Sequence, residues 1–165
     1  MAEEIAARWE KEETFHQSIA AREGSPAFVF YEGPPSANGT PGIHHVLSRT
    51  IKDIICRYKT QQGFQVRRKA GWDTHGLPVE LGVEKKLGIT KEDVGAKISI
   101  EEYNAICREA VMEFTDEWEE LTRRMGYWID MNDPYVTCTN KYIETLWWLL
   151  KQLFERGLLY KGYTI

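Results

Sequence analysis

One stretch near the N-terminus narrows the folds open to this chain more than any other. The apolar run Ala27–Phe30 predicts a strand over residues 27–32. A turn rich in glycine and proline follows, and a helical pattern then runs from about Ile43 to Gln61. A strand that passes through such a turn into a helix is typical of α/β folds, in which the next strand returns parallel to the first.

The rest of the chain continues this alternation of strands and helices. The other expected helices are an amphipathic helix over 3–22, a short helix over 79–87, a long helix over 99–125 and a helix over 141–156. The long helix starts with a capping box of Ser99 and Glu102. The other expected segments are strands over 65–70 and 158–165 and a turn-rich segment over 126–139. We therefore predict a Rossmann-like α/β domain with a parallel sheet and helical insertions over residues 27–165, preceded by a helical extension over residues 1–26.

The spacing of apolar residues predicts which side of each helix is buried. In the helix over 43–61 the expected buried residues are Leu47, Ile51, Ile54, Ile55 and Tyr58. The basic residues between them, expected to face solvent, are Arg49, Lys52, Arg57 and Lys59. In the helix over 141–156 the expected buried residues are Ile143, Leu146, Trp147, Leu150, Leu153 and Phe154.

Two other patterns have a structural interpretation and a functional one. The aromatic stripe of the long helix, which includes Tyr103 and Trp118, predicts core packing rather than a platform for stacked bases. The strand over 65–70 carries Arg67, Arg68 and Lys69, which is unusual for a central strand. We expect it to lie at a sheet edge or to pair with acidic helices, with phosphate contact as the alternative.

Composition excludes several classes of protein. The chain of 165 residues is 42% hydrophobic and 28% charged, as in a globular domain, and its net charge of −4 argues against a generally basic nucleic-acid binder. Its three cysteines form no CxxC pair, which gives no support to a zinc knuckle or a disulfide framework and favours a reducing compartment. We find no membrane-length apolar run and no signal peptide, and expect a cytoplasmic protein.

The turn and helix start after the first strand are suited to an anionic ligand. A helix N-terminus offers unpaired backbone N–H groups and a partial positive charge, and ligands of α/β folds collect at the carboxyl ends of the strands. His44 and His45 lie at this helix start, where their imidazoles can donate hydrogen bonds to phosphate oxygens. Two adjacent histidines without a nearby carboxylate or cysteine are poor evidence for a metal site, so no bound metal is predicted.

The stretch Tyr31–Asp53, which reads YEGPPSANGTPGIHHVLSRTIKD, resembles the His-x-Gly-His signature of class I aminoacyl-tRNA synthetases. The flanks Gly33–Gly39 and Gly71–Pro78 are most similar to those of the isoleucyl enzymes. The resemblance implies the N-terminal half of a class I catalytic domain, and because such enzymes are several times longer, we expect a fragment that stops before the editing insertion. One departure is plain, since Gly42-Ile43-His44-His45 exchanges the first and third positions of the signature.

The resemblance implies an isoleucine–tRNA ligase, which uses ATP with Mg²⁺ to make isoleucyl-adenylate and then charges tRNA(Ile). The expected partners are isoleucine, ATP and tRNA(Ile), with most tRNA contacts outside this segment, and the expected state is a monomer. The second ATP signature of the family, Lys-Met-Ser-Lys-Ser, does not occur in these residues, so we expect the fragment alone to be inactive. The alternatives are a non-catalytic nucleotide or amino-acid binding module, an interaction protein, another class I nucleotidyltransferase, and a valyl or leucyl enzyme.

The resemblance also assigns roles to single residues. His44 and His45 are the expected catalytic and ATP-binding histidines, and Gly42 and Asn38 are expected to border ATP, although Asn38 could instead only hold the turn. The expected amino-acid site consists of Gly33 and Pro34, as an apolar wall, and Asp73, as the partner of the α-ammonium group or, alternatively, a loop cap. Two outcomes of the exchanged signature stay open: His44 takes over the phosphate contact, or ATP binding is impaired.

Overall fold

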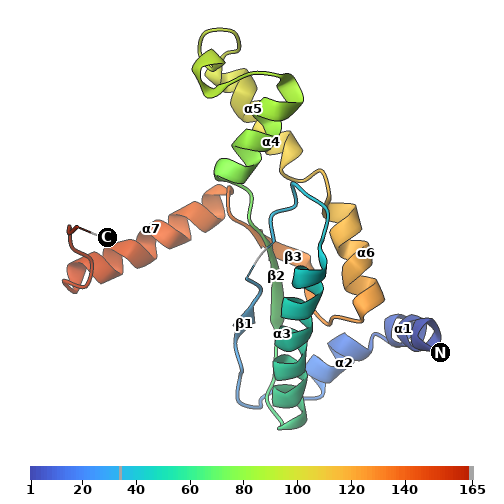
Figure 1. Cartoon of the computed structure of the whole chain (residues 1–165). Helices are drawn as coiled ribbons and strands as arrows, with labels where there is room; N and C mark the ends of the chain where they lie inside the picture. The colour runs from blue at the N-terminus through green and yellow to red at the C-terminus, as the bar shows by residue number, and fades with distance from the viewer. Residues whose placement is uncertain (34, 164–165) are drawn as a thin grey trace.

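The protein has a three-stranded parallel sheet flanked by helices, as shown in a computed structural model that describes residues 1–33 and 35–163 (Figure 1). The strands are β1 (Phe30–Tyr31), β2 (Arg68–Trp72) and β3 (Asp130–Val136), in the order β1-β2-β3. Both strand pairs are parallel, so all three strands end at the same edge of the sheet. The predicted fold class, a Rossmann-like α/β unit with a parallel sheet, is confirmed.

The helices lie around this sheet and beyond its carboxyl edge. They are α1 (Ala2–Lys11), α2 (Thr14–Ala20), α3 (Ile43–Gln61), α4 (Leu77–Leu87), α5 (Ile100–Ala110), α6 (Thr115–Met125) and α7 (Asn140–Glu155), with a short 3₁₀ helix η1 (Lys91–Asp93). In Figure 1, α3 and α6 run beside the strands, α4 and α5 form a pair above the carboxyl ends, and α7 projects away from the sheet. The predicted bounds of α3 agree with the structure.

Two helices predicted to be continuous are broken, in each case by tertiary contacts. The helix over 3–22 breaks at Glu13, which has a φ of 50°. On one continuous helix Trp9 and Phe15 would point about 120° apart, whereas the break lets both rings pack against Trp128, at 5.2 and 6.2 Å. The helix over 99–125 breaks before α6, where the backbone N–H of Phe114 leaves the helical pattern and donates to the carbonyl of Ala37 at 3.0 Å.

Strand predictions near the C-terminus were wrong. The segment predicted as turns, 126–139, contains β3, the strand that pairs with β2. Pro134 and its neighbours made this segment read as a turn, and the structure accommodates them in a bulge: Lys69 pairs with Asp130, but Gly71 already pairs with Tyr135. The strand predicted over 158–165 is absent over 158–163, and the remaining two residues lie outside the described part of the chain.

The assignment of the two faces of α3 was also wrong. The predicted buried residues are exposed, with Leu47 65% and Ile54 60% accessible, whereas the predicted solvent-facing Arg49 is 4% accessible. Hydrophobic periodicity points to an apolar buried face, but this helix presents a polar stripe to the sheet and to α6. The stripe follows helical spacing and consists of His45, Arg49, Lys52, Asp53, Cys56 and Thr60. Its charges can be buried because each finds a partner.

The apolar face predicted to be buried on α7 is exposed as well. None of the residues of this helix is fully buried, and Trp147 and Phe154 are among its most accessible side chains. By contrast, the stripe of the predicted long helix is confirmed as core at Tyr103, Val111 and Trp118, which are buried.

The basic strand β2 lies in the centre of the described sheet, so its predicted edge position is wrong. The other prediction for this strand, pairing with an acidic residue of a helix, is confirmed. Arg68 is 1% accessible, and its guanidinium lies 2.7 Å from the carboxylate of Asp53 on α3. Arg57 pairs with the same carboxylate at 2.7 Å, and its guanidinium lies against both Trp9 and Trp128, at 5.0 and 3.9 Å from the ring centroids. Asp53 therefore joins β2, α3 and, through Arg57, the N-terminal helix α1.

Gly71 in β2 is required for a close approach, because the ring of Tyr135 lies against its Cα. A Cβ at this position would stand 2.4 Å from the ring. We expect Gly71→Ala to lower the free energy of unfolding by about 2 kcal/mol, the usual cost of an overpacked site. In a Tyr135→Leu background the same change should cost much less, since the clashing ring atoms are gone. Urea unfolding of the four variants measures this coupling.

Gly82 provides the matched control for this prediction. It lies inside α4, and a Cβ added there would have no atom within 4 Å. Gly82→Ala should therefore raise stability, by up to about 1 kcal/mol, because alanine favours the helix. An equal loss of stability at both glycines would contradict the packing argument.

Candidate functional site

Three loops meet at the carboxyl edge of the sheet. The loop after β1 contains the Gly/Pro-rich turn, and its Pro35 carbonyl accepts a hydrogen bond from the backbone N–H of Asp73, which follows β2, at 3.0 Å. The next loop residue, Thr74, donates its N–H to the hydroxyl of Thr137, which follows β3, at 3.0 Å. The structure thus brings the two sequence motifs, Gly33–Gly39 and Gly71–Pro78, together at this edge.

His45 caps the N-terminus of α3, and this contact determines which nitrogen of its ring carries the proton. Gly42 is the N-cap residue, and its backbone N–H donates to Nδ1 of His45 at 2.9 Å. A ring nitrogen that accepts a hydrogen bond carries no proton, so in the neutral ring the proton is on Nε2. His45 therefore accepts the backbone N–H of Gly42 through Nδ1 and retains its Nε2–H as a hydrogen-bond donor.

Burial supports the same protonation state of His45. The pKa of His45 is lowered from its ordinary value, first by desolvation and then by the nearby charges of His44, Arg49 and Lys52. The ring of Trp118 lies edge-on to the imidazole, with centroids 4.8 Å apart and an interplanar angle of 71°. The lowered pKa favours a neutral imidazole at pH 7.

His44 packs over Gly42, which explains how the exchanged signature fits this backbone. The imidazoles of His44 and His45 lie 3.8 Å apart between centroids, and a Cβ at Gly42 would stand 2.8 Å from Cε1 of His44. The ring of His44 thus occupies the space that the first atom of a side chain at position 42 would need. The side chain of His44 is otherwise exposed at the mouth of the loop.

The turn itself is held by the start of α6. Phe114 donates its backbone N–H to Ala37, as noted above, and the indole Nε1 of Trp118 donates to the carbonyl of Gly39 at 2.9 Å. Asn38 is half-buried between these two anchored residues. The backbone around Asn38 is therefore fixed by contacts that come from more than seventy residues later in the chain.

The residues expected to bind the amino acid lie in the same region. Asp73 is half-exposed; its carboxylate lies 3.7 Å from Nδ1 of His75 and 3.5 Å from the hydroxyl of Thr137. Gly33 is exposed, and its carbonyl accepts from Nζ of Lys52 at 3.3 Å. Pro34, the other residue of the expected apolar wall, lies outside the described residues.

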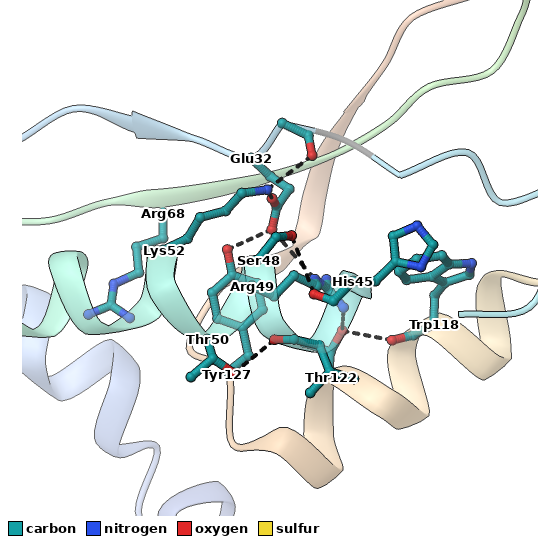
Figure 2. Close-up of polar contacts among 12 residues, drawn as sticks. Glu32, His45, Ser48, Arg49, Thr50, Lys52, Arg68, Trp118, Thr122 and Tyr127 are labelled. Atoms are coloured by element: carbon teal, nitrogen blue, oxygen red, sulfur yellow. Dashed lines mark hydrogen bonds and ion pairs between the residues drawn. The ribbon is translucent and has the colours of Figure 1, made fainter. Parts of the chain in front are cut away.

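Sequence reasoning missed a buried charge network directly behind this site (Figure 2). Glu32, which precedes Gly33, is 2% accessible; it pairs with Lys52 and accepts from the hydroxyl of Tyr127 at 2.6 Å. Nε of Arg49 lies 3.7 Å from the carboxylate oxygen that accepts from Tyr127, and Arg49 donates to the hydroxyl of Thr122 at 2.9 Å. Burial and the hydrogen bond to Glu32 raise the pKa of Tyr127. The available signal was the spacing of Arg49, one helical turn after His45.

A parallel sheet with two histidines at the start of α3 and a carboxylate directly after β2 agrees with what the resemblance to class I synthetases implies. The family model for tRNA synthetases class I (I, L, M and V) matches residues 4–165, and the chain belongs to this family. The fold is similar to that of a leucyl enzyme, Agrobacterium radiobacter LeuRS in a ternary complex with tRNA and LeuAMS. The TM-score is 0.65 at 20% identity, over 99% of this chain and 18% of that one.

Curated relatives share the sequence at much higher identity. An isoleucine–tRNA ligase of Porphyromonas gingivalis is 70% identical over 163 residues, which is 99% of this chain and 14% of that protein. Isoleucine–tRNA ligase 2 of Bacillus thuringiensis subsp. konkukian is 53% identical over 161 residues, or 98% of this chain and 16% of that protein. The chain therefore spans about one seventh of the length of the first relatives that it matches.

The described residues contain neither a helix suited to span a membrane nor a cluster of metal ligands. Within residues 1–33 and 35–163, no helix has both the length and the apolar character needed to cross a membrane. In the same part of the chain, no three His, Cys, Asp or Glu side chains are grouped closely enough to hold a metal ion.

The state of His45 predicts a pH dependence of stability. Because its folded pKa lies below its unfolded value of about 6.5, the stabilisation is complete above that pH and is lost as the pH falls towards the folded pKa. His45→Asn keeps an acceptor for the Gly42 N–H but does not titrate. The urea midpoint of the unchanged protein should therefore fall more than that of His45→Asn between pH 7.5 and 5. Parallel midpoint curves would contradict a lowered pKa.

Proposed function

We propose that this chain forms the ATP- and amino-acid-binding part of an isoleucine–tRNA ligase, and that the whole enzyme activates isoleucine and transfers it to tRNA(Ile). The observation that carries the proposal is the hydrogen bond between the loop of Asp73 and the turn that leads into the histidine pair at the start of α3. The 70% identity to a protein named isoleucine–tRNA ligase supports the choice of amino acid. The expected monomeric state, the cytoplasmic location and the extension over residues 1–26 remain part of this proposal.

Activation joins the isoleucine carboxylate to the α-phosphorus of ATP and releases pyrophosphate. One carboxylate oxygen attacks in line, the bond from the α-phosphorus to the bridging oxygen breaks, and negative charge develops on the phosphate oxygens. The N-terminus of α3 stabilises this charge through its free backbone N–H groups and its dipole. Nε2–H of the neutral His45 is placed to add a hydrogen bond, while Mg²⁺ that arrives with ATP neutralises further charge.

The position of His44 favours one outcome of the exchanged signature. Because its ring lies over Gly42, an imidazole is still present beside the first signature position, although it originates from the third. We therefore assign the phosphate contact of the missing first histidine to His44. Gly42 and Asn38 would border the nucleotide along the anchored turn.

The amino acid would lie between the loops that follow β1 and β2. The half-exposed carboxylate of Asp73 can pair with the α-ammonium group through a charge-assisted hydrogen bond. Gly33, with Pro34, would form the apolar wall next to the isoleucine side chain. Nζ of Lys52 donates to the carbonyl of Gly33 at 3.3 Å and so ties this residue to α3.

Isoleucine-dependent exchange of pyrophosphate into ATP tests the proposal. We expect exchange by the full-length product of the gene with isoleucine, and much less with valine or leucine. Asp73→Asn should raise KM for isoleucine at least tenfold, because it removes a charge-assisted bond, whereas Asp116→Asn on the exposed side of α6 should leave it unchanged. Absence of exchange in a folded protein that binds ATP would instead favour the non-catalytic binding module.

The packing of His44 on Gly42 makes a second prediction. Gly42→His alone places a side chain where the His44 ring already lies and displaces that exposed ring from its position, so KM for ATP should rise. The double variant Gly42→His with His44→Gly frees that space and restores one imidazole, so it should bind ATP better than the single variant. Steady-state exchange at varied ATP concentration measures both. A double variant that is worse than the single one would show that the two positions do not share this space.

A further inference from the structure

Trp118 stands between the signature turn and the buried charge network. Trp118 is 1% accessible; its Nε1 donates to the carbonyl of Gly39 in the turn, and its indole makes a T-shaped contact with His45 at the start of α3. Among the described residues, the hydrogen bonds from other elements to carbonyls of residues 35–39 come from Asp73, Phe114 and Trp118. Two of these three donors lie one helical turn apart at the start of α6.

The other side of Trp118 is fixed by Arg49. The guanidinium lies 5.5 Å from the centroid of the indole, and it donates to Thr122, whose hydroxyl in turn donates to the carbonyl of Trp118 at 2.7 Å. The guanidinium also faces Glu32 at 3.7 Å. Backbone and side chain of Trp118 are therefore both held by a buried cation that is paired with the residue before Gly33 (Figure 2).

The consequence for His45 is geometric. Its Nδ1 is occupied by Gly42, so the direction of Nε2–H depends on the rotation of the ring, and the indole edge of Trp118 limits that rotation from one side. The same indole fixes the position of the turn through its hydrogen bond to the carbonyl of Gly39. Trp118 contacts both the donor and the turn directly, whereas the side chain of Asp73 contacts His75 and Thr137, and the carbonyl of Gly33 contacts Lys52.

We propose that Trp118 is a positioning residue for ATP: it holds His45 and the carbonyl of Gly39 in the arrangement that receives the phosphates. This inference rests on the proposed function, since it names how the same site is built. Trp118 itself need not touch ATP. It follows that a change at Trp118 should alter the use of ATP and leave the use of isoleucine nearly unchanged, which a purely stabilising role would not do.

The test is Trp118→Phe in the full-length product of the gene, which keeps an aromatic edge near His45 but removes the N–H that reaches Gly39. We expect KM for ATP to rise about fivefold, as for one lost hydrogen bond, with KM for isoleucine within about twofold of its original value. Trp128→Phe is the matched control: Trp128 also packs on an arginine, Arg57, and its other contacts among the described residues are with Trp9, Phe15 and Arg68 rather than with the turn. It should lower thermal stability without changing either KM.

Several results would overturn the inference. These are an unchanged KM for ATP in folded Trp118→Phe, or equal changes in both KM values. If Trp118→Phe does not fold, Thr122→Val decides the question: it removes the hydroxyl between Arg49 and Trp118 while keeping the shape. It should raise KM for ATP in the same selective way, and no selective effect would overturn the inference.

Equilibrium binding of Mg-ATP without amino acid separates this inference from the proposed function. If the unchanged protein binds ATP but shows no isoleucine-dependent exchange, the proposed function fails, and the inference is still tested by the affinity of Trp118→Phe, which should be about fivefold weaker. An unchanged affinity would overturn it. If the unchanged protein does not bind ATP, both proposals are wrong.

Discussion

The rest of this structure depends on the pairing of one buried carboxylate, that of Glu32, with its partners. Glu32 directly follows β1, and it is paired with Lys52 and Arg49 of α3 and with the hydroxyl of Tyr127 in the segment after α6. A buried charge is tolerated only when its partners are in place, and removal of one partner typically costs about 3–5 kcal/mol. The network therefore fixes α3 and α6 against the sheet directly behind the signature turn.

The same network explains what could be predicted from the sequence and what could not. The strand, turn and helix around Tyr31–Asp53 follow from local pattern, and the bounds of α3 agree with it. The side of α3 that faces the sheet does not follow from local pattern. Hydrophobic periodicity identifies an apolar face, and it cannot recognise that Arg49 finds charged partners on the opposite face. The exposed Leu47 and Ile54 show the resulting error.

Errors elsewhere have the same origin in contacts between distant segments. The break before α6 depends on Ala37, which takes the N–H of Phe114, and β3 depends on the pairing of Tyr135 beside Gly71 in β2. Neither pair can be recognised from spacing along the chain. The motif residues at the carboxyl edge, by contrast, could be brought together in advance, because parallel strands that end at one edge require it.

The packing of His44 on Gly42 has a consequence for how such a signature can change over time. With glycine at both positions the site has no imidazole beside the first position, and with histidine at both the two side chains compete for one space. With the phosphate contact that we propose for His44, either single replacement is a disadvantage on this backbone, whereas the exchanged pair is not. Positions 42 and 44 should thus behave as one inherited unit, and a lineage would pass from one order to the other only through a poorly fitted intermediate or a simultaneous double change.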